Sequence, residues 1–267
     1  RSTLFPYTTL FRSRDRTSGI LIDNATDIYI VSTSSIVVGG NGTSVEPDNG
    51  LKVINGSSIT ITGEIILQDN TANAVELSGN SLLVADTIKA SNEASYSDIT
   101  GINITEQSQL KVSSITVEHN EYGIYADNAE IEITTYLKTE NNDTGIYLNE
   151  STMTISDAQA YLINREDGNG IEVNGSQLQI TQSDINIYDG DYGIKSENDS
   201  IVTITGSTID VSGTDEVGLE NVDITNSSVT LSDNNEGLNV TEGNNKTIIG
   251  GTLMVTDNVT GITAEEG

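Results

Sequence analysis

The stretch GIEVNGSQLQITQSDINIYDGDY (residues 170–192) decides the fold. Apolar residues stand two positions apart at three places in it, and one polar residue separates the members of each pair. Because strand side chains point alternately to opposite faces, each pair predicts a short strand with one buried face. The three pairs are Ile171/Val173, Leu178/Ile180 and Ile185/Ile187. The stretch therefore predicts three short strands separated by turns.

The same pattern recurs along the chain. It is clear in GINITEQSQLKVSSITVEHNEY (residues 101–122) and in GIKSENDSIVTITGSTIDVSGTDEV (residues 193–217). Each copy opens on a glycine followed by Ile or Leu, with a period of about two dozen residues. Strands this short do not fold alone, but equivalent strands of successive copies can pair in parallel and bury one continuous aliphatic column. The opening glycines are Gly19, Gly50, Gly101, Gly123, Gly145, Gly170, Gly193, Gly218, Gly237 and Gly261.

We therefore expect an all-β fold, a right-handed parallel β-helix of about ten coils, with roughly 22–25 residues and three short strands in each coil. Helix is disfavoured by the alternating β-branched residues and by the many Gly, Asn, Ser and Thr residues. Asparagines follow the first strand in several copies, where the chain must turn. Asn accepts a left-handed backbone more readily than most residues, so we expect structural corners at Asn55, Asn149, Asn174 and Asn198.

Residues 1–16 differ in composition from the rest. Both phenylalanines, Phe5 and Phe11, lie here, as do four of the eleven basic residues and one of the forty acidic ones. Residues 3–13, TLFPYTTLFRS, resemble the translation of a sequencing adapter. We interpret residues 1–16 as a non-native or disordered leader and 17–267 as a single β-helix domain truncated at both ends. The alternative is a genuine N-terminal cap with an aromatic plug.

The remaining chain, residues 17–267, has seven basic and 39 acidic residues, a net charge of about −32. Such a charge repels phosphate backbones and anionic lipids, so we expect no nucleic-acid partner and no membrane insertion in this segment. The chain has no cysteine, which excludes a disulfide framework, a zinc–thiolate site and a cysteine nucleophile.

The copies that begin at Gly101, Gly123, Gly145, Gly170 and Gly193 resemble the right-handed parallel β-helix superfamily. This superfamily includes pectate-lyase-like enzymes and the passenger or stalk regions of bacterial surface adhesins. The resemblance covers residues 19 to about 265 and is a packing pattern, so it implies a fold and not a chemistry. It also implies an extracellular or cell-surface location.

A catalytic interpretation starts from the only histidine and the only arginine of residues 17–267. Aligning the copies two places after the third strand puts His119, Asn141, Arg165 and Asp189 in one column. His119, Arg165 and Asp189 would then supply a base and a charge clamp for an acidic sugar. The alternative is a solvated rim where the rare basic residues neutralise neighbouring acids.

Two binding interpretations concern other outward residues. Tyr125 and Tyr147 occupy the same place in adjacent copies, so their rings would stack and contact a sugar, or form a bland surface ladder. Asp167, Asp189 and Asp191 cluster before a glycine and are candidates for weak Ca²⁺ binding, although the alternative is a solvated edge. No other cofactor is expected.

From these features we expect a structural and adhesive stalk segment of a bacterial cell-surface or secreted protein, with glycans or a host surface as partners and no catalysis in this segment. The alternative is a polysaccharide-active enzyme, a lyase or a glycoside hydrolase, with an acidic glycan as substrate. A spacing element without any ligand is the third hypothesis.

Overall fold

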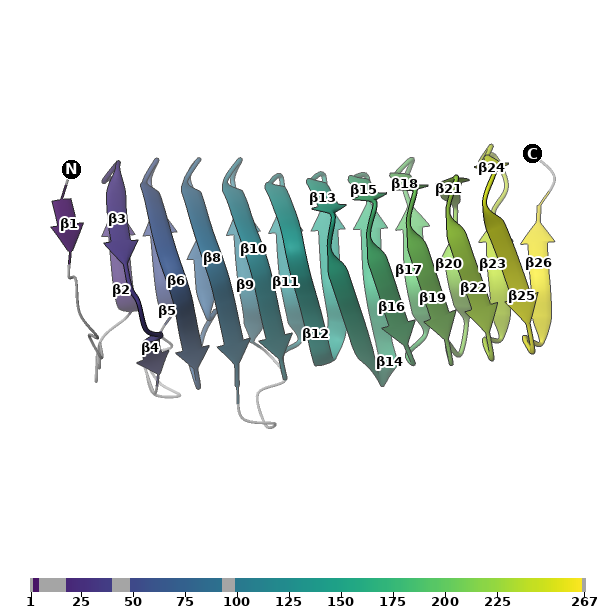
Figure 1. Ribbon diagram of the computed structural model, residues 1–267, viewed down its shortest axis with the longest axis horizontal. Coiled ribbons are helices and arrows are strands. Elements are labelled where there is room, and N and C mark those ends of the chain that lie inside the picture. Colours follow the sequence, from purple (N-terminus) through teal and green to yellow (C-terminus); the bar gives the residue numbers. More distant parts are fainter. Residues whose placement is uncertain (1, 5–17, 40–48, 93–98, 266–267) are drawn as a thin grey trace. The chain divides into compact units, whose positions relative to one another are not determined.

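The structure is a computed structural model that describes residues 2–4, 18–39, 49–92 and 99–265. The described residues form strands and turns and contain no helix (Figure 1). The chain divides into two compact units, Arg1–Ile133 and Thr134–Gly267, and each is described by itself. Among the described residues, no helix is long and apolar enough to cross a bilayer.

Unit 1 is a stack of parallel strands. β5 pairs with β2 and β7, β9 pairs with β7 and β11, β6 pairs with β3 and β8, and β10 pairs with β8. Its strands are β1 (Ser2–Leu4), β2 (Ser18–Asp23), β3 (Ile28–Val31), β4 (Ile36–Gly39), β5 (Asn49–Ile54), β6 (Ser58–Gln68), β7 (Val75–Leu77), β8 (Leu82–Ser91), β9 (Thr100–Thr105), β10 (Gln109–Glu118), β11 (Tyr122–Asp127) and the start of β12 (Glu130–Asn149).

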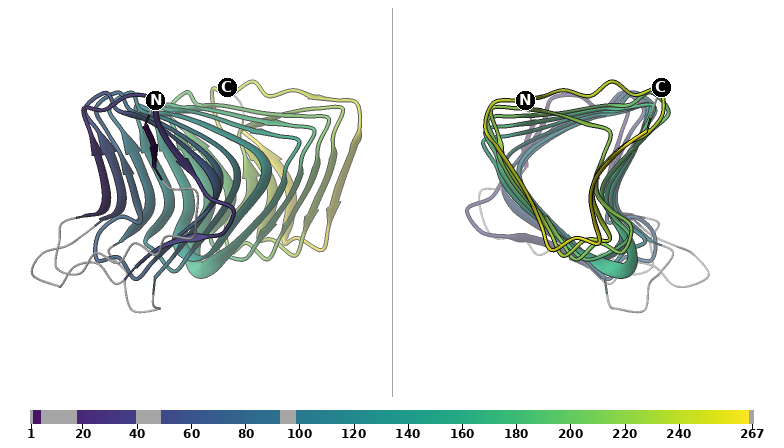
Figure 2. Two further views of the ribbon diagram at one scale, coloured as in Figure 1. Left: turned by 60° about the vertical axis from the view of Figure 1, so that its left-hand side comes forward. Right: turned by 90° about the vertical axis from the view of Figure 1, so that its right-hand side faces the viewer.

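Unit 2 holds the rest of β12 and the later strands, and its coils present three faces (Figure 2). The first face comprises β17, β20, β23 and β26 and the second halves of β12 and β14. The second face comprises β13, β15, β18, β21 and β24. The third face comprises β16, β19, β22 and β25 and the first halves of β12 and β14.

The strand bounds of unit 2 after β12 are as follows. They are β13 (Thr152–Ser156), β14 (Gln159–Asn174), β15 (Gln177–Thr181), β16 (Asp184–Tyr188), β17 (Tyr192–Glu197), β18 (Ile201–Thr205), β19 (Thr208–Ser212), β20 (Val217–Glu220), β21 (Val222–Thr225), β22 (Ser228–Ser232), β23 (Glu236–Val240), β24 (Ile248–Ile249), β25 (Thr252–Thr256) and β26 (Thr260–Ala264).

The core of each unit is the aliphatic column that the alternating pairs predict. In the copy at residues 170–192 all six paired residues are at most 1 % exposed. Their equivalents stack on them, for example Leu178 beside Met153 and Val202. The predicted all-β, right-handed parallel β-helix is confirmed, with about nine turns rather than ten.

Buried serines line two corners of unit 2, and the sequence analysis did not identify them. At the first corner the backbone N–H of Ser151 donates to Ser176 Oγ at 2.9 Å, and the N–H of Ser176 donates to Ser200 Oγ at 3.1 Å. At the second corner the N–H of Ser183 donates to Ser207 Oγ at 3.1 Å. Buried backbone donors need partners, so these hydroxyls stabilise each turn against the next coil.

The predicted asparagine corners differ in where the backbone becomes left-handed. Asn55 and Asn198 have φ of 58° and 52°. Asn149 and Asn174 end β12 and β14, and the residue after each has a φ of 46° or 54°. In unit 2 the side chains form a chain of hydrogen bonds: Asn174 Nδ2 donates to Asn149 Oδ1 at 2.7 Å, and Asn198 Nδ2 donates to Asn174 Oδ1.

The leader prediction (residues 1–16) lies outside the described residues except at β1, which pairs in parallel with β3. The prediction of one domain over 17–267 stays a prediction.

Candidate functional site

Arg165 is displaced from the column that the sequence predicts. The paired register of β14 and β16 ends at Ile163 beside Tyr188, and Asn164 Nδ2 donates to the Asp189 carbonyl oxygen at 3.1 Å. Arg165 lies one residue further along, where its Nη1 donates to Asp143 Oδ1 at 2.6 Å. The predicted column of Asn141 and Arg165 does not match the register of β12 and β14, because Glu140 pairs with Ile163 and Asn142 pairs with Asn164, which places Arg165 beyond Asn142. The alignment of Arg165 with Asp189 stays a prediction.

A shallow pocket of about 660 Å³ surrounds this arginine. Its lining is Asp143, Asn164, Arg165 and Asp167. His119 belongs to unit 1, where it follows β10 with a φ of 62°. The catalytic combination of His119, Arg165 and Asp189 therefore stays a prediction.

Every Lys and Arg side chain of the described residues lies close to a carboxylate. The longest of the seven nitrogen–oxygen distances is 3.9 Å, for Lys246 and Asp223. No lysine or arginine in the described part of the chain is therefore without a carboxylate partner. The pairs are Lys52 with Glu76, Lys89 with Glu64, Lys111 with Glu132, Lys138 with Glu140, Arg165 with Asp143, Lys195 with Glu197, and Lys246 with Asp223.

Of the acidic residues predicted to bind calcium, Asp167 lies inside β14, and Asp189 and Asp191 lie between β16 and β17. Asp167 and Asp189 are exposed and Asp191 is half-buried. The N–H of Asp191 donates to the Gly168 carbonyl oxygen at 2.7 Å, which ties the two segments together. Within the described residues no group of three or more His, Cys, Asp or Glu side chains has a geometry that could hold a metal ion. Calcium binding stays a prediction.

The tyrosines predicted to contact sugar belong to different units. Tyr125 of β11 packs edge-on against Tyr122, with ring centres 5.4 Å apart and an interplanar angle of 71°. Tyr147 of β12 lies beside Glu172 of β14. The predicted stacking of Tyr125 and Tyr147 stays a prediction.

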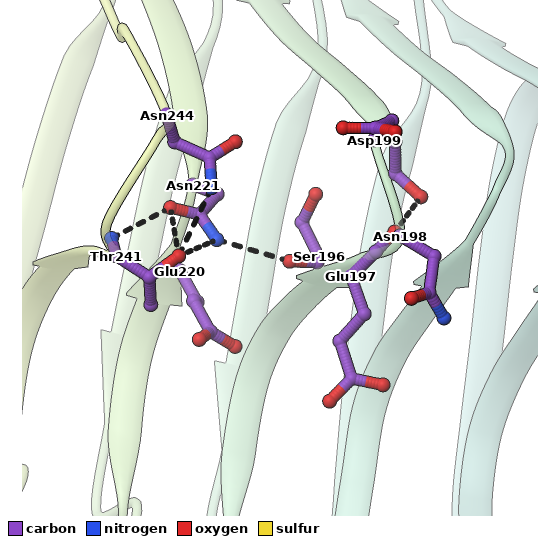
Figure 3. Close-up of a pocket in the computed structure, with 9 residues that line it drawn as sticks. Ser196, Glu197, Asn198, Asp199, Glu220, Asn221, Thr241 and Asn244 are labelled. Carbon is purple, nitrogen blue, oxygen red and sulfur yellow. Dashed lines mark hydrogen bonds between the residues drawn. The ribbon is translucent and has the colours of Figure 1, made fainter. Parts of the chain in front are cut away.

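Sequence analysis missed a polar pocket of about 370 Å³ in unit 2 (Figure 3). Asn221 holds its wall together, because Asn221 Nδ2 donates to the Ser196 carbonyl oxygen at 3.1 Å and to Thr241 Oγ1 at 2.9 Å. In Figure 3 the Glu197 and Glu220 side chains extend in the same direction from neighbouring strands. The pocket therefore presents two carboxyl groups on adjacent coils.

The two carboxyl groups have different environments. Burial, followed by the charge of Glu197, raises the pKa of Glu220. Glu197 instead forms an ion pair with Lys195, with 2.9 Å between Lys195 Nζ and Glu197 Oε1. Burial acts to lower the pKa of Lys195. The hydrogen bond to Glu197 and the charge of Glu197 act to raise it and outweigh burial, so the pKa of Lys195 is raised overall. Lys195 Nζ also lies 5.1 Å from the centre of the Tyr192 ring, a cation–π contact.

A second feature that sequence analysis missed is a row of three outward tyrosines on the third face, Tyr136, Tyr161 and Tyr188, which we call the tyrosine strip. The Tyr136 and Tyr161 rings are 6.2 Å apart, at an interplanar angle of 47°. Tyr188 Oη donates to Asn186 Oδ1 at 3.3 Å. All three residues are half-buried, so part of each ring remains open to a ligand.

Comparisons of the chain with protein family models, with curated proteins and with solved structures found no match.

Proposed function

We propose that the chain is a structural and adhesive stalk segment of a bacterial cell-surface or secreted protein, which contacts glycans or a host surface without cleaving them. The parallel β-helix supplies flat strand faces on a scaffold held by its buried aliphatic column and serine corners. Its partners and its extracellular location are part of this proposal.

The observation that carries the proposal is the pairing of all seven described Lys and Arg side chains with carboxylates of the chain itself. An enzyme that acts on an acidic glycan needs cations that are free to bind the sugar carboxylate. The arginine that would provide this contact, Arg165, is bound to Asp143. A non-catalytic role fits this arrangement better than acidic-glycan cleavage does.

One observation favours the second candidate, a glycoside hydrolase. Glu197 and Glu220 line one pocket, and the pKa of Glu220 is raised while Glu197 is ion-paired. Glycosidases use two carboxyl groups held in different environments, one of which has a raised pKa and acts as the general acid. Against it, one Glu220 oxygen, Oε2, is buried from solvent, whereas a general acid must reach the leaving oxygen of its substrate.

A glycan array probed with the labelled chain, with and without calcium, tests the adhesive role. Binding to a restricted set of glycans supports it, and a negative array under both conditions would leave only a spacing role. Calcium-dependent binding that is lost on Asp189→Asn and Asp191→Asn would support the predicted calcium contact.

Cleavage is tested on the same glycans by mass spectrometry. Products that appear with the wild-type chain and disappear with Glu220→Gln would replace the adhesive role by the glycoside hydrolase. Loss of products on His119→Ala or Arg165→Ala would point to the sequence-predicted column.

A further inference from the structure

We propose that the tyrosine strip binds an oligosaccharide of amine-bearing sugars, a glucosamine chain, laid across the coils of unit 2. The inference deepens the proposed adhesive role and rests on it, because it assumes a glycan that is held and not cleaved. The site is distinct from Tyr125 and Tyr147 and from the pocket of Glu197 and Glu220.

The register of the third face sets the geometry of the strip. Tyr136 lies beside Gln159, Tyr161 lies two residues further along β14, and Ile163 two residues beyond Tyr161 lies beside Tyr188. The strip therefore advances by one coil, about 4.8 Å, and by two residues, about 6.7 Å, at each step. It forms a diagonal aromatic row over three strands, β12, β14 and β16, which suits a linear chain of rings.

The surface chemistry of the row suits a pyranose. Tyrosine rings offer flat apolar faces that pack against the C–H face of a sugar ring, and the phenol hydroxyls reach its hydroxyl groups. Ile163 points outward beside Tyr188 and extends the apolar surface. Asn186 lies next to Tyr161 in the register and supplies an amide among the rings.

The charge around the strip selects the kind of sugar. Asp184 lies two residues before Asn186 on β16, and Asp210 of β19 lies beside Asn186. Burial raises the pKa of Tyr188, and the nearby charges of Asp210 and Asp184 raise it as well, so the site is electronegative. Within the described residues neither aspartate has a Lys or Arg partner. A uronic acid would be repelled here, whereas a protonated amine would be attracted.

The chain itself shows how such a surface holds an ammonium group. On the first face, Lys195 Nζ lies over the Tyr192 ring at 5.1 Å and contacts Glu197 at 2.9 Å. On the third face, Tyr188 has the carboxylates of Asp210 and Asp184 nearby, while Lys138 lies beside Tyr161 and is paired with Glu140. The ammonium group of a bound amine-bearing sugar can therefore lie against Tyr188 and these carboxylates, as Lys195 Nζ lies against Tyr192 and Glu197.

The test is calorimetric titration of the full chain with a glucosamine hexamer, its fully N-acetylated form, a galacturonate hexamer and hexalysine. We expect the glucosamine hexamer to bind and the galacturonate hexamer not to bind. Tyr161→Ala and Tyr188→Ala should each weaken glucosamine binding by about tenfold. Tyr29→Ala, at a half-buried tyrosine of β3 in unit 1, is the matched control and should leave it unchanged. Far-ultraviolet circular dichroism checks that each variant is folded.

The role of the two aspartates is tested separately. Asp184→Asn and Asp210→Asn should weaken glucosamine binding and leave any binding of the N-acetylated hexamer unchanged. The inference is overturned if the glucosamine hexamer does not bind, or if its N-acetylated form binds equally well. It is also overturned if the strip variants bind the glucosamine hexamer as tightly as the wild type does. Hexalysine that binds as tightly as the glucosamine hexamer, and loses affinity in the same variants, would overturn it as well. Shortening of the hexamer would instead overturn the non-catalytic role, while the loss of binding in the strip variants would still support the strip.

Discussion

Arg165 Nη1 donates to Asp143 Oδ1 at 2.6 Å, so the one arginine of residues 17–267 is committed to a carboxylate of β12. The contact joins two adjacent coils of unit 2. It also occupies the arginine that would otherwise bind the negative charge of an anionic substrate. The carbonyl oxygen of Asp189 instead accepts a hydrogen bond from Asn164 Nδ2.

The first prediction concerns this ion pair. Both side chains are more than a third exposed, so solvent screens the pair and Arg165→Gln should lower the free energy of unfolding by about 1 kcal/mol or less. Urea unfolding at low and high salt measures it, and the difference should shrink in high salt. A loss of several kcal/mol at both salt concentrations would mean that Arg165 has a deeper structural role.

The second prediction concerns the serine corners. Ser176→Ala removes the acceptor of the Ser151 N–H in a buried corner, so it should lower the free energy of unfolding by about 1–3 kcal/mol. Ser228→Ala is the matched control, because the Ser228 side chain is exposed and only its backbone bonds to the neighbouring coil. Equal denaturation midpoints for the two variants would refute the structural role of the buried hydroxyl.

The third prediction concerns the close approach of coils at the repeat glycine. A Cβ on Gly193 would lie 2.4 Å from the Gly218 carbonyl oxygen and 2.5 Å from Val211 Cγ1. Gly193→Ala should therefore destabilise unit 2 by about 1–3 kcal/mol or more, since backbone would have to move. Gly175→Asn is the control, because a Cβ there has no heavy atom closer than 3.9 Å and Asn accepts its φ of 54°. Thermal unfolding followed by circular dichroism measures both variants, and equal unfolding midpoints would contradict the close approach of the coils at Gly193.

The fourth prediction concerns pH. The pKa of Glu220 is raised in the folded protein, so its ionised form destabilises the fold. That penalty is absent below the unfolded pKa of about 4.3, sets in as pH rises, and is complete above the folded pKa. Glu220→Gln should therefore raise the unfolding midpoint near pH 7 and have little effect near pH 3. An effect of the same size at both pH values would show that charge is not the cause.

The fold could be predicted because its signal is local and repeated. Pairs such as Leu178/Ile180 and Ile185/Ile187 alternate in most copies, and parallel stacking is the arrangement that buries such pairs in one column. The serine corners carry a comparable signal, which the search for apolar pairs passed over. Ser176 and Ser183 each stand two residues before the first buried apolar residue of a strand, Leu178 and Ile185.

The candidate sites were harder to predict because they depend on register. A fixed offset from the third strand placed Arg165 beside Asn141, but the β12–β14 pairing shifts around Asn142, so that Asn164 pairs with Asn142 and Arg165 lies beyond it. The tyrosine strip runs diagonally, so a search along columns of equivalent positions does not bring Tyr161 and Tyr188 together. The polar pocket needs side chains from three coils, and the spacing of Glu197 and Glu220 in the sequence does not reveal it.

The most direct test of the central claim, that the chain holds glycans without cleaving them, is the chain-length distribution of acidic, neutral and amine-bearing polysaccharides. It is measured by light scattering during prolonged incubation with the protein at high concentration, with and without calcium. We predict that every distribution stays unchanged. Shortening by the wild-type chain, abolished by Glu220→Gln or by Arg165→Ala, would contradict it.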